Sequence, residues 1–172
     1  MQIQPTTNNQ LQQVASKKPL IEELSKGYNA VIVREHLGQF IQRGAVNFGE
    51  VLKISMQHRI PELTKTQEGR KDVLKALTGI LGAFMNKLKL KYAMTNDDIV
   101  DLAVLIIDES HEDNLAIEDV LLFLQGMARF KYGDIEYKMD SVTFFKMFEK
   151  YRQERYLTIR RFREEEQASF KI

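Results

Sequence analysis

The chain of 172 residues contains no cysteine and no tryptophan, and it has only three prolines. Without cysteine there is no disulfide, no thiolate metal site and no cysteine nucleophile, and this composition fits a reducing compartment. No segment approaches the roughly 18 apolar residues that a membrane span requires. Residues 1–16 are polar and lack the apolar segment of a signal peptide. We therefore expect a soluble protein of the cytoplasm that does not enter a membrane.

The chain also has no large excess of positive or negative charge, since 25 basic residues are balanced by 24 acidic ones and the formal net charge is +1. Such a chain has no overall field that would attract nucleic acid or an anionic membrane, so a charged partner would need a local patch. The hydrophobic share of 44% and the charged share of 28% are typical of a globular protein. The length suits one domain of ordinary size.

Patterns of catalytic chemistry are scarce. The three histidines lie in separate segments without the spacing of zinc ligands, and no glycine-rich loop precedes a Lys-Ser/Thr pair that could hold phosphates. Asp97, Asp98 and Asp101 could collect Mg²⁺ as in a nuclease, but at the start of a helix they are better explained as partners of the helix dipole. We expect no enzyme, no cofactor and no metal, and a Mg²⁺-dependent nuclease is the catalytic alternative.

Apolar residues at helical spacing are abundant in the middle of the chain. Over 68–92 they recur every three or four residues, which predicts an amphipathic helix, and two glycines within it predict a helix that crosses closely there. Thr95 followed by Asp98 predicts a capping box and a helix start near Asn96. The body of that helix is apolar on nearly all sides, which predicts a central, largely buried helix. A polar break at 108–114 should precede the next apolar helix.

The last third of the chain is rich in aromatic residues. Residues 131–140 interrupt the helical pattern and predict a short extended joint or a tight hairpin. Asp140 or Ser141 should then cap a long final helix that reaches about Glu166. This helix is long enough to project beyond a compact body.

In the first third of the chain the sequence predicts a tail and short helices instead of long ones. Residues 1–18 are rich in Gln and Asn and predict a tail that is disordered or ordered by a partner. Residues 19–62 predict short helices, in which 29–43 is favoured as a helix over a strand at 28–33. A further helix is expected over 47–58.

Together these segments predict an all-α fold with one helical domain over 19–172. Its main helical core should cover 66–166, preceded by the short helices. The expected architecture is an irregular single-domain bundle of about five to six helices, with a long C-terminal helix and the short extended joint at 131–140.

Arginines alternate with aromatic residues in the final helix, which holds half of the ten arginines of the chain. Guanidinium forks and aromatic faces suit phosphates and unstacked bases. Glutamates run alongside, and Glu and Arg at i and i+4 usually pair with each other or across a coiled-coil seam. Three interpretations stay open: a solvated or self-paired face, a surface for a protein partner, and a nucleic-acid site.

A characteristic order of motifs runs through residues 95–155. An apolar helix is followed by Asp119-Val120-Leu121-Leu122-Phe123, then by Lys131-Tyr132-Gly133, a tyrosine and Asp140, and then by an aromatic helix with Tyr151 and Arg155. This order resembles a group of small helical proteins encoded by bacteriophages and mobile elements of gut bacteria. In organisation the chain is also similar to phage helicase loaders, which suggests an accessory role in the replisome. The resemblance carries no catalytic residue to this chain.

These observations predict a non-enzymatic protein-interaction adaptor, acting as a replisome accessory or helicase-loader-like factor. The alternative is a structural component of a virion, ordered by neighbouring subunits. The expected partners are a helicase or a virion subunit, weakly bound single-stranded nucleic acid and further copies of the chain, in the bacterial host cytoplasm or in the virion. The candidate contact residues are Lys131, Tyr132, Tyr137, Arg152, Arg155, Tyr156, Arg160, Arg161 and Arg163.

Overall fold

The computed structural model describes residues 47–171, and the predictions made for residues 1–46 lie outside this part of the chain. The described part is an all-α single domain, as predicted. Its elements are α3 (Phe48–Leu52), the 3₁₀ helix η1 (Met56–His58), α4 (Ile60–Leu63), α5 (Gln67–Leu88), α6 (Asn96–Asp113), α7 (Ile117–Ala128) and α8 (Ser141–Ser169). Within residues 47–171 there is no β-strand, and the one β-bridge joins Tyr92 to Lys138 in parallel.

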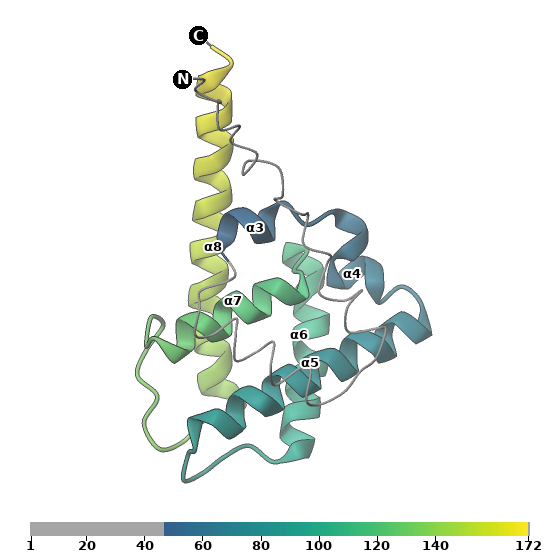
Figure 1. The fold of residues 1–172 in the computed structure, drawn as a ribbon, viewed down its shortest axis with the longest axis vertical. Coiled ribbons are helices and arrows are strands. Elements are labelled where there is room, and N and C mark those ends of the chain that lie inside the picture. Colours follow the sequence, from purple (N-terminus) through teal and green to yellow (C-terminus); the bar gives the residue numbers. More distant parts are fainter. Residues whose placement is uncertain (1–46, 172) are drawn as a thin grey trace, which may run out of the picture.

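Helices α5, α6 and α7 form the body of the molecule, and α4 closes one end of it against α5 and α6. The first half of α8 packs against α6 and α7, while its second half runs beyond the body as the yellow helix of Figure 1. The short α3 lies between α7 and α8. The fold therefore presents one long helix that leaves the body at its C-terminal end.

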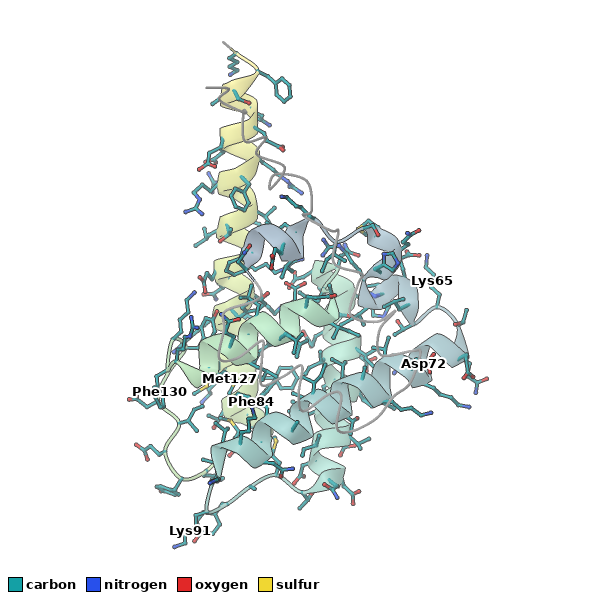
Figure 2. The ribbon with its side chains drawn as sticks, in the orientation of Figure 1. Lys65, Asp72, Phe84, Lys91, Met127 and Phe130 are labelled. Atoms are coloured by element: carbon teal, nitrogen blue, oxygen red, sulfur yellow. The ribbon has the colours of Figure 1, made fainter. Side chains whose placement is uncertain are left out.

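Aromatic rings form the centre of the contact between α7 and α8. Phe123 of α7 is fully buried and lies 5.2 Å from Phe144, 5.0 Å from Phe148 and 5.8 Å from Tyr151, measured between ring centroids. Edge-to-face and tilted pairs at such distances are favourable. In Figure 2, Phe84 of α5 and Met127 of α7 lie inside the body, and both are buried. The aromatic C-terminal third thus supplies a large share of the core.

The helix expected over 47–58 is divided into α3 and η1, and the guanidinium of Arg59 binds carbonyls around the division. Its Nη2 donates to the carbonyls of Val51 (3.3 Å), Leu52 (3.4 Å) and Ile54 (2.9 Å), and its Nη1 donates to the carbonyl of Asn114 (2.9 Å). Carbonyls at a helix C-terminus need partners from outside the helix. Burial lowers the pKa of Arg59, although the nearby Asp119 carboxylate acts in the opposite direction.

Two predictions about α6 are wrong. The polar break expected from residue 108 is absent, because α6 continues to Asp113 and ends where Asn114 takes the left-handed conformation at φ 52°. Its acidic last turns are stabilised by pairing with α8, described below. The helix is also not buried on most sides, since Val100 and Leu105 keep 38% and 44% of their surface exposed.

The geometry corrects one further prediction and decides between the two alternatives for the joint at 131–140. No helix crosses closely at Gly82, where an added Cβ would meet no atom within 4 Å. The joint at 131–140 contains no hairpin, because its extended part pairs with the α5–α6 connection through the backbone N–H of Tyr92, which donates to the carbonyl of Tyr137 (3.1 Å). By contrast, the capping box of Thr95 and Asp98 and the cap at Asp140 are confirmed.

Substitution of alanine at two glycines of α5 should have opposite effects. A Cβ at Gly69 would lie 1.9 Å from the carbonyl oxygen of Leu63, so the α4–α5 connection would have to shift. We expect Gly69→Ala to lower the free energy of unfolding by about 1–3 kcal/mol. Gly82→Ala should raise it by about 0.5–1 kcal/mol, because the helix interior is relieved of a flexible residue without a clash. Urea unfolding followed by circular dichroism measures both, and a stable Gly69→Ala variant would contradict the close contact.

The cap of α8 predicts a local dependence on pH. The carboxylate of Asp140 accepts from the backbone N–H of Thr143 (2.8 Å) and pairs with Lys138 (3.1 Å), and these contacts lower the pKa of Asp140 from 3.8 to about 2. A carboxyl group with a lowered pKa in the folded state contributes stability above pH 3.8, and this is lost as the pH falls through about 2. Titration of side-chain carboxyl signals by NMR should give this low midpoint, and Asp140→Asn should remove the dependence. A midpoint near 3.8 would contradict the cap.

Candidate protein-interaction surface

Residues 151–155 in the middle of α8, which we call the root of α8, are fixed to the start of α7 by a buried polar cluster. The carboxylate of Asp119 is fully buried, and its Oδ1 accepts from the hydroxyl of Tyr151 (2.6 Å) and from Nε of Arg155 (2.7 Å). Its Oδ2 accepts from the backbone N–H of Ala116 (2.8 Å). Burial and the neighbouring carboxylate raise the pKa of Tyr151, so the phenol remains protonated and donates its hydrogen. Buried polar groups that are all satisfied in this way rigidify the elements that they join.

A second cluster fixes α8 to the end of α6. The guanidinium of Arg152 pairs with Glu109 (3.0 Å), Glu112 (2.9 Å) and Asp113 (2.5 Å) of α6, and with Glu149 one turn earlier in α8 (3.3 Å). Burial lowers the pKa of Arg152, but the hydrogen bonds to Asp113 and Glu112 raise it by more, so the guanidinium stays charged. The acidic last turns of α6 are therefore not merely solvated, because one arginine of α8 holds them.

The joint between α7 and α8 is attached to the opposite side of α8. The hydroxyl of Tyr132 donates to the carboxylate of Glu154 (2.9 Å), which also pairs with Lys131. Lys150 donates to the carbonyl of Tyr132 (2.8 Å), and the Tyr132 ring covers Gly126, where a Cβ would lie 2.4 Å from a ring carbon. Burial and the hydrogen bond to Glu154 raise the pKa of Tyr132. Three sets of contacts thus hold the first half of α8 in place.

Beyond Arg155 the helix leaves the body, and we name residues 156–169 the α8 extension. Tyr156 and Leu157 are 65% and 60% exposed, and Phe162 is 37% exposed. Phe170, directly after the helix, is 88% exposed. Figure 1 shows the extension standing clear of α3 and α7 over its last turns. Exposed aromatic and aliphatic side chains on a firmly held helix are typical of an interaction surface.

Two grooves flank the root of the extension. The first has a volume of about 430 Å³ and lies between the end of α6 and α8; its lining includes Asn114, Tyr156, Ile159 and Arg163. The second has a volume of about 760 Å³ and lies between the start of α3 and the other side of α8, where Leu157 is one of the lining residues. Both grooves are open, and acidic and basic residues of α6 and α8 line most of the first one. They offer space for side chains of a partner.

The structure separates the predicted contact residues into two groups. Tyr132 and Arg155 are only 5% and 6% exposed, and the side chain of Arg152 is only 14% exposed. These three side chains are largely buried and bonded within the fold, so they hold α8 in place, and their contact with a partner stays a prediction. The other predicted contact residues lie on the surface: Lys131, Tyr137, Tyr156, Arg160, Arg161 and Arg163.

Internal pairing reduces the charge that the surface arginines present. Arg160 pairs with Glu164 (2.9 Å) and Arg161 with Glu165 (3.7 Å), each one turn apart, as the Glu/Arg spacing predicts. Arg163 has no ion pair within residues 47–171. A surface of this kind is nearly neutral along most of its length.

Sequence reasoning missed some exposed apolar residues. Leu157 and Phe170 were not singled out, although they are 60% and 88% exposed. Tyr92 was missed because its neighbour is distant in the chain: its ring lies 6.2 Å from that of Tyr137 in an edge contact. Helical periodicity could have revealed the first two, whereas nothing local to Tyr92 indicates its contact.

Within residues 47–171 no group of three His, Cys, Asp or Glu side chains is placed to hold a metal ion. The carboxylate of Asp98 instead accepts from the backbone N–H (2.9 Å) and hydroxyl (2.7 Å) of Thr95, and these bonds lower the pKa of Asp98. Among the described helices, none combines the length and the hydropathy needed to cross a membrane.

The fold and this surface define an all-α protein with a projecting, partly apolar helix. Comparison of the chain with models of protein families, with curated proteins and with solved structures finds no match.

Proposed function

We propose that the protein is a non-enzymatic protein-interaction adaptor that binds its partner through the α8 extension. The observation that carries this proposal is the 60% exposure of Leu157, together with Tyr156, on a helix whose root is held by buried ionic contacts. A preformed helix loses little conformational freedom on binding, so its apolar side chains contribute more fully to affinity. The groove beside Leu157 provides room for an apolar side chain of the partner.

The proposed setting is a bacteriophage or mobile element, in which the protein assists DNA replication in the host cytoplasm as a helicase-loader-like factor. Support for this setting comes from the resemblance carried by residues 95–155 and from the organisation of a small helical body with a projecting end. The proposed partner is then a replicative helicase. The likeness in organisation assigns no residue beyond those on the extension.

A binding measurement on matched leucines tests the adaptor proposal. Leu157→Glu should weaken binding to the host replicative helicase by roughly tenfold or more, because one charged group would replace an apolar contact. Leu105→Glu is the control, since Leu105 is also an exposed helical leucine (44%) but lies on α6. Equal binding by both variants and by the unaltered chain would overturn the assigned surface, and an absence of helicase binding would overturn the replication role.

The second candidate is a structural component of the virion, and the projecting extension favours it because such a helix can pack between neighbouring subunits. Mass spectrometry of purified particles separates the two candidates. A virion component should be present at a fixed ratio to the capsid protein, whereas a replication adaptor should be missing from the particles.

Single-stranded nucleic acid is a weaker partner in this proposal. Two of the three arginines of the extension are paired with glutamates, and the three arginines at 160, 161 and 163 are offset by three glutamates at 164–166. We expect fluorescence anisotropy with a single-stranded oligonucleotide to show weak binding that is lost as salt rises. Alanine at Arg160, Arg161 and Arg163 should reduce the salt dependence; an unchanged affinity would remove nucleic acid from the list of partners.

A further inference from the structure

The α8 extension carries a second face, distinct from that of Leu157. Residues 156, 159, 163, 166 and 170 follow each other at intervals of three and four, which is the spacing of a coiled-coil seam. Since successive residues of a helix are separated by about 100°, this seam lies on nearly the opposite side of α8 from Leu157. Its members are Tyr156, Ile159, Arg163, Glu166 and Phe170.

The seam contains two charged residues that form no ion pair with any residue of the described range 47–171. Arg160 and Arg161 are paired with Glu164 and Glu165. Arg163 and Glu166, the two charged residues of the seam, have no ion pair within residues 47–171. They are enclosed between Ile159 on one side and the 88% exposed Phe170 on the other. The seam thus has apolar ends and two opposite charges at its centre.

We infer that the extension pairs with the extension of a second copy of this chain, and that the two helices run antiparallel. In this register Arg163 of each copy lies opposite Glu166 of the other, and Ile159 lies opposite Phe170. Every contact then occurs twice about a two-fold axis, as a closed dimer requires. The inference does not depend on the proposed adaptor function, because Leu157 lies on nearly the opposite side of the helix from the seam; Tyr156 belongs to both surfaces.

The order of the charges selects the antiparallel direction. In a parallel pair Arg163 would face Arg163 and Glu166 would face Glu166, and like charges opposed at a seam are destabilising. In the antiparallel pair the same residues form two ion pairs between copies. The self-complementary order of one basic and one acidic residue therefore specifies both the partner and its orientation.

The first groove supplies the receiving site for Phe170 of the second copy. It lies beside Ile159 and is an open groove with a volume of about 430 Å³. Tyr156 contributes an aromatic ring to the lining, and the other lining residues include Asn114 and the charged residues Glu112, Asp113, Arg152, Arg155, Arg160, Arg163 and Glu164. Because the last turns of α8 stand clear of the body, a second helix can approach along them (Figure 1).

Sedimentation velocity of the full chain over a range of concentrations tests the inference. The contact is limited to a few helical turns, so we expect a dimer that forms with rising concentration, as small interfaces do. Arg163→Glu and Glu166→Arg should each weaken the dimer by roughly tenfold, because each places like charges opposite each other. The double variant should restore it to within about threefold, since the order of the charges is then only reversed. Leu157→Ala is the matched control and should leave the dimer unchanged.

Crosslinking tests the orientation without background, because the chain contains no cysteine. When Ile159→Cys and Phe170→Cys variants are mixed and oxidised, the antiparallel register predicts a crosslink between the two variants and little between two copies of Ile159→Cys. Any of three results would overturn the inference: crosslinks mainly between two copies of Ile159→Cys, a monomer at all concentrations, or a double charge variant that does not restore the dimer. A monomer that still loses helicase binding on Leu157→Glu would overturn the dimer alone and leave the adaptor function standing.

Discussion

Replacement of Asp119 by alanine should lower the free energy of unfolding by about 3–5 kcal/mol, because it leaves the charge of Arg155 buried without a partner. The side chain of Arg155 is only 7% exposed, so water cannot replace the lost carboxylate. The same substitution removes the acceptor for the Tyr151 hydroxyl and for the backbone N–H of Ala116. Urea unfolding followed by circular dichroism measures the loss.

Two further variants make this prediction specific. Asp101→Ala removes an exposed carboxylate from α6 and should change the free energy of unfolding by no more than about 0.5 kcal/mol. Joint replacement of Asp119 and Arg155 by leucine should cost less than Asp119→Ala alone, since no charge remains buried. A loss below about 1 kcal/mol for Asp119→Ala would mean that the cluster is accessible to water and does not fix the root of α8.

Phe123→Ala should be comparably damaging, with an expected loss of about 3–5 kcal/mol. Its ring is fully buried and contacts the rings of Tyr132, Phe144, Phe148 and Tyr151. Removal of the ring leaves a cavity whose walls belong to α7, α8 and the joint between them. The loss of near-ultraviolet circular dichroism from the tyrosines should accompany the lower stability.

The matched control for Phe123 is Phe130, which follows α7 and is 60% exposed. In Figure 2 its ring lies at the edge of the molecule. Phe130→Ala should stay within about 0.5 kcal/mol of the unaltered chain. If the two alanine variants unfolded at the same urea concentration, the aromatic cluster around Phe123 would not be the centre of the core.

The parts of the fold that were predictable from sequence depend on neighbours within one helical turn. The capping box of Thr95 and Asp98 joins residues three apart, and so does the cap that Asp140 provides for Thr143. The apolar spacing of α5 likewise repeats within each turn. Local physics determines these features, so their residues identify them without reference to the rest of the chain.

The corrected parts depend on contacts between residues far apart in the chain. The acidic run at the end of α6 looks like a polar break until Arg152, about 40 residues later, is placed against it. Asp119 looks like an ordinary first-turn acid until Tyr151 and Arg155 approach it from α8. Both cases show a charged residue whose role is set by a partner that local patterns cannot locate.

The candidate surface was predictable in its location but not in its composition. Periodicity placed arginines and aromatic residues on a projecting final helix, and the structure has that helix. The same pattern could not tell that Arg152 and Arg155 face inward while Tyr156 faces outward, because all three belong to neighbouring positions around the helix. Which of these residues is buried depends on the side of α8 that α6 and α7 contact. The sequence of α8 alone does not identify this side.

The guanidinium of Arg59 has a consequence for how the molecule opens. Helices α3 and η1 comprise 5 and 3 residues, too few to persist alone, and the bonds from Arg59 to carbonyls around them are their main polar link to the body. Residues 47–58 should therefore exchange their amide hydrogens as one cooperative unit, ahead of α5 and α7. Lysine at position 59 could not preserve this link, because an ammonium group lacks the planar fork that reaches several carbonyls at once.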